Sequence, residues 1–370
     1  MSAVDVVVIG GGIAGISVAA TLPPELKVVV IERESSLTHH STGRSAAVLL
    51  EGLGGSAFSA LTSVGVSTLA QPDPDFSEVP FIEPRGLVTL DVEGHEPEDV
   101  SADIANSRLT QVQELDIDAI VELVPWVDPR LIIAGRYQQE VFDLDVAGLH
   151  QAYVRQARRN GVEIVRNCEA LTLDTVRKTW TVDTPQRRFS APTVVNAAGA
   201  WGDVVAEFAG VSKVGLVAKR RTAFTVAAPG VRGGPMIDTS AADFYAKPES
   251  GEQLLLSPMD KTPVEPCDVR HEEIDVARTI EIAQPYLLPQ LRTVRTAWAG
   301  LRTFAPDQHP VIGWGDREGF FWMCGQGGTG IQSAPGAAAC AVSLLLGHGV
   351  PRDAVEAGLD PVTIDPLRFL

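Results

Sequence analysis

The N-terminal part of the chain has the clearest pattern of apolar and small residues. Residues 4–9 form a continuous, β-branched apolar run, which is typical of a strand buried on both faces. A glycine-rich turn over 10–15 follows, and residues 16–22 predict a helix that a Pro-Pro pair ends. Residues 27–31 are again apolar and β-branched. The first 32 residues therefore predict a complete strand–helix–strand unit.

The rest of the chain alternates between patterns typical of strands and of helices. We expect strands at 86–92, 161–165, 192–196, 219–227, 252–257, 294–303, 310–314 and 319–324. We expect helices at 98–123, from an N-cap at Asp145 to about Asn160, after Trp201, at 272–284, and from about Thr329 to Leu346. The 370 residues predict two to three domains at about 150 residues each. Since no long linker separates the elements, we expect the domains to be interleaved.

Composition and charge exclude several classes of protein. Lys and Arg total 30 and Asp and Glu total 47, so the net charge is −17. A surface this acidic repels phosphate backbones, so no nucleic-acid partner is expected. No apolar run reaches the ~18 residues of a transmembrane helix, and the N-terminus lacks the features of a signal peptide. We therefore expect no transmembrane segment and a cytoplasmic location.

The four cysteines, at positions 168, 267, 324 and 340, do not have metal-ligand spacing. They are also too few for a disulfide-stabilised secreted fold. Neither a metal site nor a disulfide is predicted, and the thiols are expected to be reduced and mostly buried.

The turn over 10–15 has the G-x-G-x-x-G spacing of a dinucleotide-binding motif. Gly10 permits the tight turn, Gly12 lets backbone amides approach a pyrophosphate, and Gly15 lets the helix pack closely on the strand. Glu32 ends the second strand, where a carboxylate accepts a hydrogen bond from a ribose hydroxyl. The unit alone does not choose between NAD and FAD, and a glycine-rich turn can be only a turn. No second motif of this kind and no C-x-x-x-x-C pair follow, which excludes a separate NAD domain and a disulfide reductase.

Five further motifs carry a resemblance to a known family. They are His40-Ser-Thr-Gly-Arg-Ser-Ala-Ala47, Val195-Asn-Ala-Ala-Gly-Ala-Trp201, Lys219-Arg-Arg-Thr-Ala-Phe224, Trp298-Ala-Gly-Leu-Arg-Thr303 and Gly325-Gln-Gly-Gly-Thr-Gly-Ile-Gln332. In this order they resemble the D-amino-acid oxidase/dehydrogenase family of FAD-dependent oxidoreductases. The resemblance extends from residue 4 to about 346, and within the family the pattern looks most like the D-arginine dehydrogenases.

The resemblance implies an α/β protein with an α+β second domain. A Rossmann-like FAD-binding domain would comprise 1–80, 140–215 and 298–370, interleaved with an antiparallel-sheet substrate domain of 81–139 and 216–297. FAD contacts are implied for Gly10, Gly12, Ile13, Ala14, Gly15, Glu32, Arg33, Ser41, Thr42, Gly43, Arg44, Ser45, Ala46, Ala47, Glu169, Ala170, Ala198, Gly199, Trp201, Arg302, Gly327, Gly328, Thr329, Gly330, Ile331 and Gln332. For the residues 41–47 the alternative is an ordinary Ser/Gly loop, and Thr329 can also be a plain helix N-cap.

The resemblance also implies a site for a substrate carboxylate. Arg302 and Arg221 look like the carboxylate-binding arginines, and Tyr245 looks like the matching tyrosine. An arginine binds a carboxylate through two parallel hydrogen bonds, and a tyrosine hydroxyl adds a third. Arg221 belongs to a Lys-Arg-Arg run, and the alternative for such a run is a solvated strand surface. Ser45 is placed near flavin N5.

The sequence departs from the D-arginine dehydrogenase pattern in the loop after residue 47. Val48 stands where a polar histidine is typical, and Leu53 where a tyrosine is typical, so both are assigned to the substrate pocket or its lid. The acidic partner of a basic side chain, on the strand near 86, is absent, which disfavours arginine and lysine as substrates. Glu51 in the glycine-rich loop is expected to face solvent. The loop is either a lid or a flexible surface loop.

The expected function is oxidative deamination of a D-amino acid with a neutral or apolar side chain, by hydride transfer from the α-carbon to flavin N5. The products would be a 2-oxo acid and ammonia. The alternatives are oxidation of a secondary amine such as an N-alkyl glycine, oxidation of a 2-hydroxy acid, or a flavin-binding protein without turnover. FAD is expected to be non-covalent, because the residues after Arg302 offer no thiol. The electron acceptor stays open between O2, a quinone and another carrier.

Overall fold

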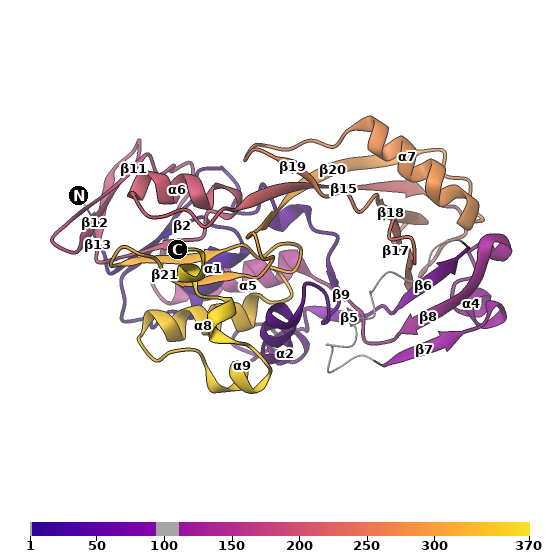
Figure 1. The fold of residues 1–370 in the computed structure, drawn as a ribbon, viewed down its shortest axis with the longest axis horizontal. Coiled ribbons are helices and arrows are strands. Elements are labelled where there is room, and N and C mark those ends of the chain that lie inside the picture. The colour runs from indigo at the N-terminus through magenta and orange to yellow at the C-terminus, as the bar shows by residue number, and fades with distance from the viewer. Residues whose placement is uncertain (1, 94–110) are drawn as a thin grey trace.

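The computed structural model describes residues 2–93 and 111–370, which form two large β-sheets with their covering helices (Figure 1). The six-stranded sheet has the order β10 (Glu163–Val165), β3 (Val28–Ile31), β2 (Val6–Ile9), β14 (Thr193–Asn196), β22 (Phe320–Cys324) and β21 (Val311–Trp314). Its first five strands run parallel, and β21 is antiparallel. A four-stranded sheet beside it has the order β1 (Ser2–Ala3), β13 (Arg188–Ala191), β12 (Thr179–Asp183) and β11 (Thr172–Val176).

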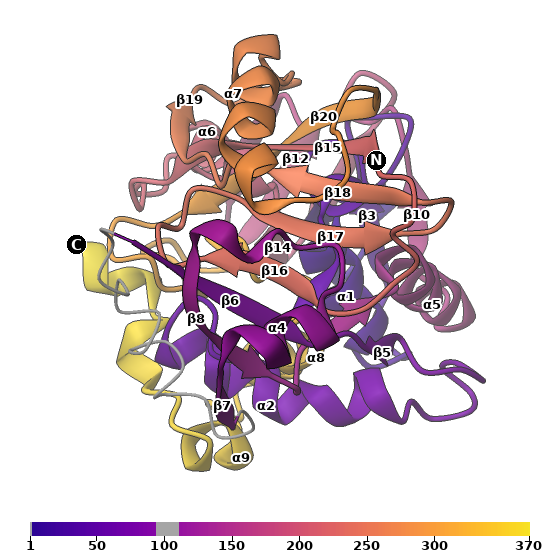
Figure 2. The same cartoon turned by 90° about the vertical axis from the view of Figure 1, so that its right-hand side faces the viewer.

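The second large sheet occupies the other end of the molecule (Figures 1 and 2). Its order is β19 (Thr262–Val264), β15 (Val217–Ala227), β18 (Gln253–Ser257), β17 (Tyr245–Glu249), β16 (Met236–Thr239), β6 (Leu87–Val92), β8 (Ile132–Gln138) and β7 (Val112–Leu115), with β20 (Val294–Phe304) also paired to β15. A small sheet of β4 (Val48–Leu49), β9 (Phe142–Leu144) and β5 (Ile82–Pro84) lies between the two ends.

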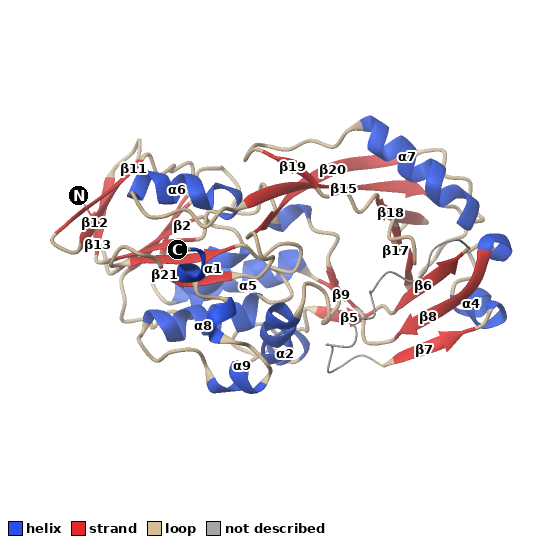
Figure 3. Ribbon diagram, viewed as in Figure 1, coloured by secondary structure: helices blue, strands red, loops and turns tan. Residues whose placement is uncertain are grey.

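The helices are distributed over both ends of the molecule (Figure 3). Those that accompany the six-stranded sheet are α1 (Ile13–Thr21), α2 (Ser56–Ala70), α5 (Val146–Arg159), α6 (Gly202–Ala209), α8 (Ala334–Leu345) and α9 (Arg352–Glu356). Those beside the nine-stranded sheet are α4 (Ile117–Leu123) and α7 (Glu273–Ala283). No helix in the described ranges is long and apolar enough to cross a membrane.

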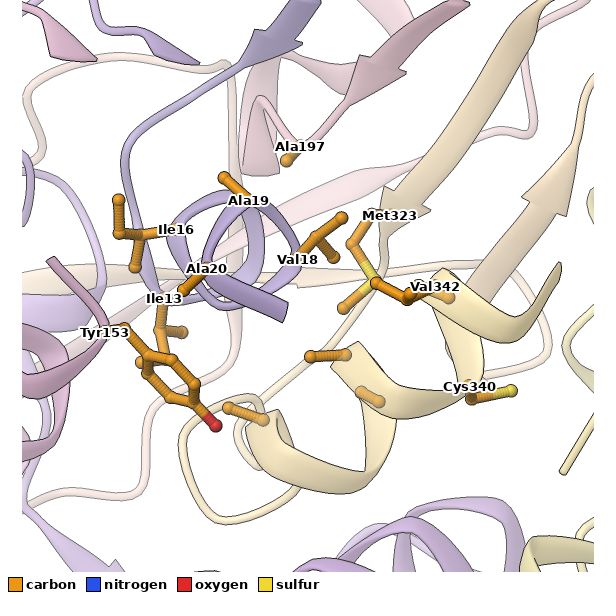
Figure 4. Packing of buried hydrophobic residues seen from close by; sticks show 14 of the residues in the cluster. Ile13, Ile16, Val18, Ala19, Ala20, Tyr153, Ala197, Met323, Cys340 and Val342 are labelled. Atoms are coloured by element: carbon orange, nitrogen blue, oxygen red, sulfur yellow. The ribbon is translucent and has the colours of Figure 1, made fainter. Parts of the chain in front are cut away.

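The strands β2 and β3 are buried on both faces, as their apolar runs predict. Val6 and Val8 belong to the core that includes α1, α5 and α8, whereas Val7 and Ile9 belong to the core shared with α6 and the four-stranded sheet. Figure 4 shows the first of these cores around α1, with Tyr153 on one side and Met323 on the other. This parallel sheet between two apolar layers gives the α/β class.

The predicted helix at 98–123 is confirmed over Ile117–Leu123, which forms α4, and is wrong over Val112–Leu115. Val112–Leu115 forms an edge strand on β8, and the side chain of Asp116 then accepts a hydrogen bond from the Ala119 amide at 2.9 Å to cap α4. Strand pairing with a distant segment overrides the local helical pattern here. The remainder of the prediction, 98–110, lies outside the described residues.

The C-terminal helix begins later than predicted. Residues 328–333 form turns, and α8 starts at Ala334 because Pro335 has no amide to donate back to the Ile331 carbonyl. By contrast, α5 has its N-cap at Asp145 and its C-cap at Asn160, as expected. The proposed division into two discontinuous domains stays a prediction, although the strands of the six-stranded sheet all come from the segments assigned to the first domain.

Candidate active site

A cavity of about 560 Å³ is lined by residues of both large sheets. The predicted site residues that line it are Gly10, Gly12, Ile13, Ala14, Glu32, Arg33, Ser41, Thr42, Arg44, Ser45, Ala46, Glu169, Ala170, Ala198, Gly199, Trp201, Arg221, Tyr245, Arg302, Gly327, Gly328, Gly330 and Ile331. Segments from four distant parts of the chain therefore meet around one space.

The glycine-rich turn brings bare backbone to this cavity. Gly10 has φ 107°, and a Cβ there would lie 2.4 Å from the Ala197 carbonyl oxygen. A Cβ on Gly15 would lie 2.0 Å from the Gly10 carbonyl oxygen, so only glycine allows α1 to pack this closely. A Cβ on Gly12 would meet only Thr42 Oγ1, at 3.4 Å. The turn thus leaves room at Gly12 for a ligand at the N-terminus of α1.

Glu32 is fixed by the same turn. Its Oε2 accepts a hydrogen bond from the Gly11 amide and its Oε1 accepts one from the Glu34 amide, both at 2.9 Å. Burial raises the pKa of Glu32, although these two hydrogen bonds oppose the rise. The carboxylate lines the cavity and keeps further lone pairs for a hydroxyl donor. An amide-rich turn next to a buried acid fits the ribose and pyrophosphate of FAD.

The two predicted arginines lie on neighbouring strands. In the β15–β20 register Arg221 is opposite Gly300 and Lys219 is opposite Arg302, so both arginines are on the same face of the sheet. The Arg302 guanidinium packs on Gly328, where a Cβ would lie 3.0 Å from Nη1. Two cations thus share one face of the cavity wall.

Burial and the charge of Arg302 lower the pKa of Arg221 to about 10, and burial lowers the pKa of Arg302. Arg221 therefore stays cationic at neutral pH, and Arg302 carries a guanidinium group, which keeps its proton in proteins. Tyr245 on β17 is 8% exposed and lines the same cavity, and its hydroxyl has no hydrogen-bond partner in the described residues. The three groups can together bind one carboxylate.

The alternative reading of the basic run as a solvated surface fails for Arg221, which is 8% exposed. Adjacent strand residues point to opposite faces, so Arg220 leaves the cavity side. It pairs with Glu272 and with Asp275 at the start of α7. The run therefore supplies one residue to the cavity and one to an ion-pair network behind the sheet.

Seven predicted residues do not line the cavity: Gly15, Gly43, Ala47, Val48, Leu53, Thr329 and Gln332. Gly15 and Gly43 have packing roles, since a Cβ on Gly43 would lie 2.8 Å from the Thr38 carbonyl oxygen. Thr329 is buried and its hydroxyl donates to the Gln326 carbonyl at 3.2 Å. The contacts assigned to these seven residues, with the cofactor or with the substrate, stay predictions.

Gln332 holds the loop that follows β4 rather than the cavity. Its Oε1 accepts from the Leu50 amide at 3.0 Å, and its Nε2 donates to the Leu50 carbonyl at 2.9 Å. Val48 packs in an apolar cluster that also contains Tyr245, while Leu53 is 40% exposed. The prediction that Glu51 faces solvent is wrong: it is 1% exposed, because this loop is folded back onto α2, where Ser59 donates to the Glu51 carbonyl at 2.8 Å.

Sequence reasoning gave no role to several further lining residues. Those inside the quoted motifs include His40, Ala223, Gly300, Leu301, Thr303 and Gln326, and those outside them include Leu37, Thr38, His39, Val204, Phe208, Glu265 and Pro266. His40 packs against the ring of Trp201, and its Nε2 lies 2.9 Å from Glu34. For His39 and His40 the available signal was their position directly before Ser41. For the loop with Glu265 and Pro266 no local signal exists, because it reaches the cavity only through tertiary contacts.

Ser41 and Arg44 connect the serine-rich segment of the cavity lining to strand β20. The Ser41 hydroxyl donates to the Leu301 carbonyl at 2.7 Å, and Arg44 Nη1 donates to the Ala299 carbonyl at 2.9 Å. Arg44 Nη2 also lies 2.6 Å from Asp268. The serine-rich segment is thus tied to β20, which carries Arg302.

Comparison with known proteins identifies the class. The model of the DAO family, described as FAD dependent oxidoreductase, matches residues 5–344, and the chain belongs to this family. It is an oxidoreductase with FAD as its cofactor. The motif-based recognition of the family is confirmed.

The chain is also similar to three known proteins. It is 26% identical to the Xenopus laevis "FAD-dependent oxidoreductase domain-containing protein 1", over 93% of this chain and 79% of that protein. It is 24% identical to the mitochondrial dimethylglycine dehydrogenase of Rattus norvegicus, over 99% of this chain. The chain spans only 45% of that dehydrogenase. The fold is similar to that of L-proline dehydrogenase from P. horikoshii, with a TM-score of 0.81, 19% identity, and coverage of 100% and 98% of the two chains.

Proposed function

We propose that the protein oxidises an amino acid at its α-carbon, with a D-amino acid of neutral or apolar side chain as substrate and a 2-oxo acid and ammonia as products. One observation carries this proposal. Arg221, Arg302 and Tyr245 line the same cavity as the glycine-rich turn. A carboxylate site is therefore adjacent to the space that suits the cofactor.

The segments that would hold FAD are those that line the amide-rich part of the cavity. We assign the pyrophosphate to the turn from Gly10 to Gly15 and a ribose to Glu32. When bound, FAD would supply the acceptor for the hydride, which carries both electrons away from the substrate. The residues Ser41 to Ala46 and Gly327 to Ile331 complete the binding site in this proposal.

The arginine pair orients the substrate. Binding a carboxylate between Arg221, Arg302 and the Tyr245 hydroxyl fixes one end of the molecule, so the α-carbon is held at one place in the cavity. The pair carries two positive charges in a buried site, which favours a single small anion over a neutral ligand. The substrate amine binds in its neutral form, so no protein base is required.

The surroundings of Tyr245 favour a neutral or apolar side chain. Tyr245 belongs to an apolar cluster whose other buried or partly buried members are Leu87, Val141, Met236, Leu255, Ala46, Val48, Leu50, Met259 and Trp298. A guanidinium or ammonium group placed against such a wall without a paired acid is unfavourable by several kcal/mol. The similarity to D-arginine dehydrogenases therefore does not extend to their substrate in this proposal. Val48 belongs to this apolar cluster, and Leu53 lies in the loop at the edge of the cluster.

A second candidate is oxidation of a secondary amine such as an N-alkyl glycine. The similarity to dimethylglycine dehydrogenase and to L-proline dehydrogenase favours it, since both names refer to N-substituted amino acids. The same carboxylate site serves this reaction, and the bond oxidised is again a carbon–nitrogen bond. A 2-hydroxy acid would also satisfy the arginine pair.

Anaerobic mixing of the holoenzyme with four substrate classes tests these candidates. The classes are D-amino acids, L-amino acids, N-methyl amino acids and 2-hydroxy acids, and the readout is bleaching of the flavin absorption. Rapid bleaching by neutral D-amino acids, with ammonia as product, supports the first candidate. Bleaching only by N-methyl amino acids, with release of methylamine or formaldehyde, supports the second. No bleaching by any class would contradict both, and peroxide formed in air would identify O2 as electron acceptor.

A further inference from the structure

One edge of β15 has a gap in its strand pairing, and this gap includes Arg221. On this edge β18 pairs with Phe224–Ala227 and β19 pairs with Ala218–Arg220. The residues between them, 221–223, face the connection between β18 and β19. Without a strand neighbour, the Thr222 amide in this gap needs another acceptor.

Asp260 fills this gap with its carboxylate. Its Oδ1 accepts from the Thr222 amide at 2.6 Å, and its Oδ2 accepts from the Thr222 hydroxyl at 3.1 Å. The side chain of Asp260 is only 10% exposed. These contacts fix the connection against the strand at the residue next to Arg221.

The turn before Asp260 brings the chain back to β15. The Ser257 hydroxyl donates to the Thr222 carbonyl at 2.7 Å and accepts from the Met259 amide at 3.2 Å. Met259 has φ 55°, in the left-handed region that is unfavourable for a residue with a side chain. A strained residue persists only where surrounding contacts over-determine it. The hydrogen bonds of Ser257 and Asp260 supply those contacts.

The backbone of Asp260 binds Arg221 directly. Its carbonyl oxygen accepts from Arg221 Nε at 2.9 Å. This bond occupies the inner nitrogen of the guanidinium and leaves Nη1 and Nη2, the paired donors that suit a carboxylate, on a residue that lines the cavity. The orientation of the guanidinium thus depends on where the connection places residue 260.

The carboxylate of Asp260 also balances charge around Arg221. The charged or titratable groups around that side chain in the described residues are Arg302 on β20, Tyr245 on β17 and Asp260, with Arg220 behind the sheet. The Arg221 Nε lies 3.9 Å from Asp260 Oδ1. Burial and Arg302 lower the pKa of Arg221 to about 10, and Tyr245 and then Asp260 oppose this lowering. Asp260 also pairs with Arg220, whose Nε lies 3.4 Å from Asp260 Oδ2, and Arg220 pairs in addition with Glu272 and Asp275.

We infer that Asp260 is a positioning residue that orients Arg221 for the substrate carboxylate. The inference rests on the proposed function, because it requires that Arg221 binds a carboxylate. Asp260 itself lies at the edge of β15 and is not among the residues that line the cavity.

Binding of acetate to the holoenzyme tests this inference without turnover. Acetate supplies the carboxylate alone, and acetamide is its uncharged counterpart. The dissociation constants are measured by calorimetry and by perturbation of the flavin spectrum, from pH 7 to pH 10.5. The variants are Asp260→Asn, which keeps an oxygen acceptor for the Thr222 amide, and Asp260→Ala, which does not. Asp275→Asn is the matched control, since among the described residues Asp275 pairs with Arg220, which Asp260 also contacts, and not with Arg221.

The wild-type protein should bind acetate below pH 10 and lose it as pH rises through about 10, when Arg221 loses its proton. Asp260→Asn should bind acetate within about threefold of wild type at pH 7.5, because Arg221 stays charged there. It should lose acetate at a lower pH, because the opposing negative charge is gone. Asp260→Ala should bind acetate about tenfold more weakly at pH 7.5, because the buried hydrogen bonds that orient the turn are lost. Asp275→Asn should bind acetate with the affinity and the pH midpoint of the wild type. The affinity for acetamide should not change with pH.

Two outcomes would overturn the inference. If both Asp260 variants keep the wild-type affinity and pH midpoint while Arg302→Ala abolishes acetate binding, the carboxylate site stands and the role of Asp260 does not. If wild-type protein binds acetate no better than acetamide, the proposed function fails and the inference fails with it.

Discussion

The two walls of the cavity are built in different ways. The wall at the parallel sheet presents backbone: the turn at Gly10 to Gly15 has glycines where a Cβ would lie 2.0–2.4 Å from a carbonyl oxygen. The wall at the nine-stranded sheet presents long side chains, with Arg221 and Arg302 on adjacent antiparallel strands and Tyr245 two strands away from Arg221.

The difference shows how each wall can vary. A backbone wall binds what all members of a family share, because its geometry depends on the absence of side chains. A side-chain wall binds the substrate, and each group on it is fixed by its own local contacts, such as the hydrogen bond between Arg221 and Asp260. Substitutions should therefore separate cofactor retention from substrate binding according to the wall they affect.

The largest effect is expected on the side-chain wall. Arg302→Ala should lower kcat/KM by about 2–5 kcal/mol in transition-state binding, roughly 30-fold to several thousandfold, while FAD stays bound. The matched control is Arg295→Ala, an exposed arginine on the same strand, which should leave kcat/KM unchanged. Steady-state kinetics with the best substrate and the flavin absorbance per protein give both quantities. Equal activity of the two variants would remove Arg302 from the site.

On the backbone wall, Gly15→Ala should lower the free energy of unfolding by about 1–3 kcal/mol, because the new Cβ overpacks α1 against Gly10. Gly12→Ala is the comparison, since its Cβ would make only an ordinary contact of 3.4 Å with Thr42. We expect it to leave the flavin-free protein as stable as wild type but to reduce retained flavin. Urea unfolding and flavin content after gel filtration measure the two effects. The same response from both variants would contradict the separate roles of the two glycines.

A smaller effect is expected at Asp238, which pairs with Tyr245 across β16 and β17. Burial raises the pKa of Asp238 to about 6, above its ordinary value of 3.8. The folded state therefore binds more protons than the unfolded state between about pH 4 and 6, so this residue reduces stability as pH rises through that window. Asp238→Asn should be about 1–2 kcal/mol more stable than wild type at pH 8, allowing for its partial exposure.

The advantage of Asp238→Asn should narrow at pH 5.5, which thermal unfolding at the two pH values will measure. The control is Asp91→Asn, since Asp91 pairs with Arg136 at 2.9 Å on the same face of the sheet. Loss of that pair should reduce stability at pH 8. The explanation fails if Asp91→Asn is more stable than wild type. It also fails if the stability gain of Asp238→Asn does not change with pH, because the buried charge of Asp238 would then not lower the free energy of unfolding.

The smallest effect is expected at a helix cap of the α/β end. Asp145 accepts from the Gly148 amide at 2.7 Å at the start of α5. Asp145→Ala should lower the free energy of unfolding by about 1 kcal/mol without changing kcat/KM. Asp145→Asn keeps the acceptor and should be nearly neutral. Equal losses for the two variants would mean that the charge, and not the hydrogen bond, stabilises the helix.

Much of the fold could be predicted because its signals are local. The apolar runs of β2 and β3 and the cap at Asp145 were confirmed, since backbone sterics and short-range hydrogen bonds decide them. Where local and long-range signals conflicted, prediction failed: Val112–Leu115 pairs as an edge strand, and Glu51 is buried by the loop over α2. Pro335 did carry a local signal, and it explains the late start of α8.

The sequence alone determined the glycine turn, Glu32 and the family, because a dinucleotide site is encoded in one contiguous stretch whose spacing reflects backbone geometry. The motif resemblance singled out Arg221 of the basic run, but only the tertiary structure showed that Arg221 lines the cavity while Arg220 lies behind the sheet. The tertiary structure also decided that Asp260, about 40 residues away in the chain, holds the first of them. Strand register sets these partners, and register depends on pairing between distant segments that no local pattern specifies.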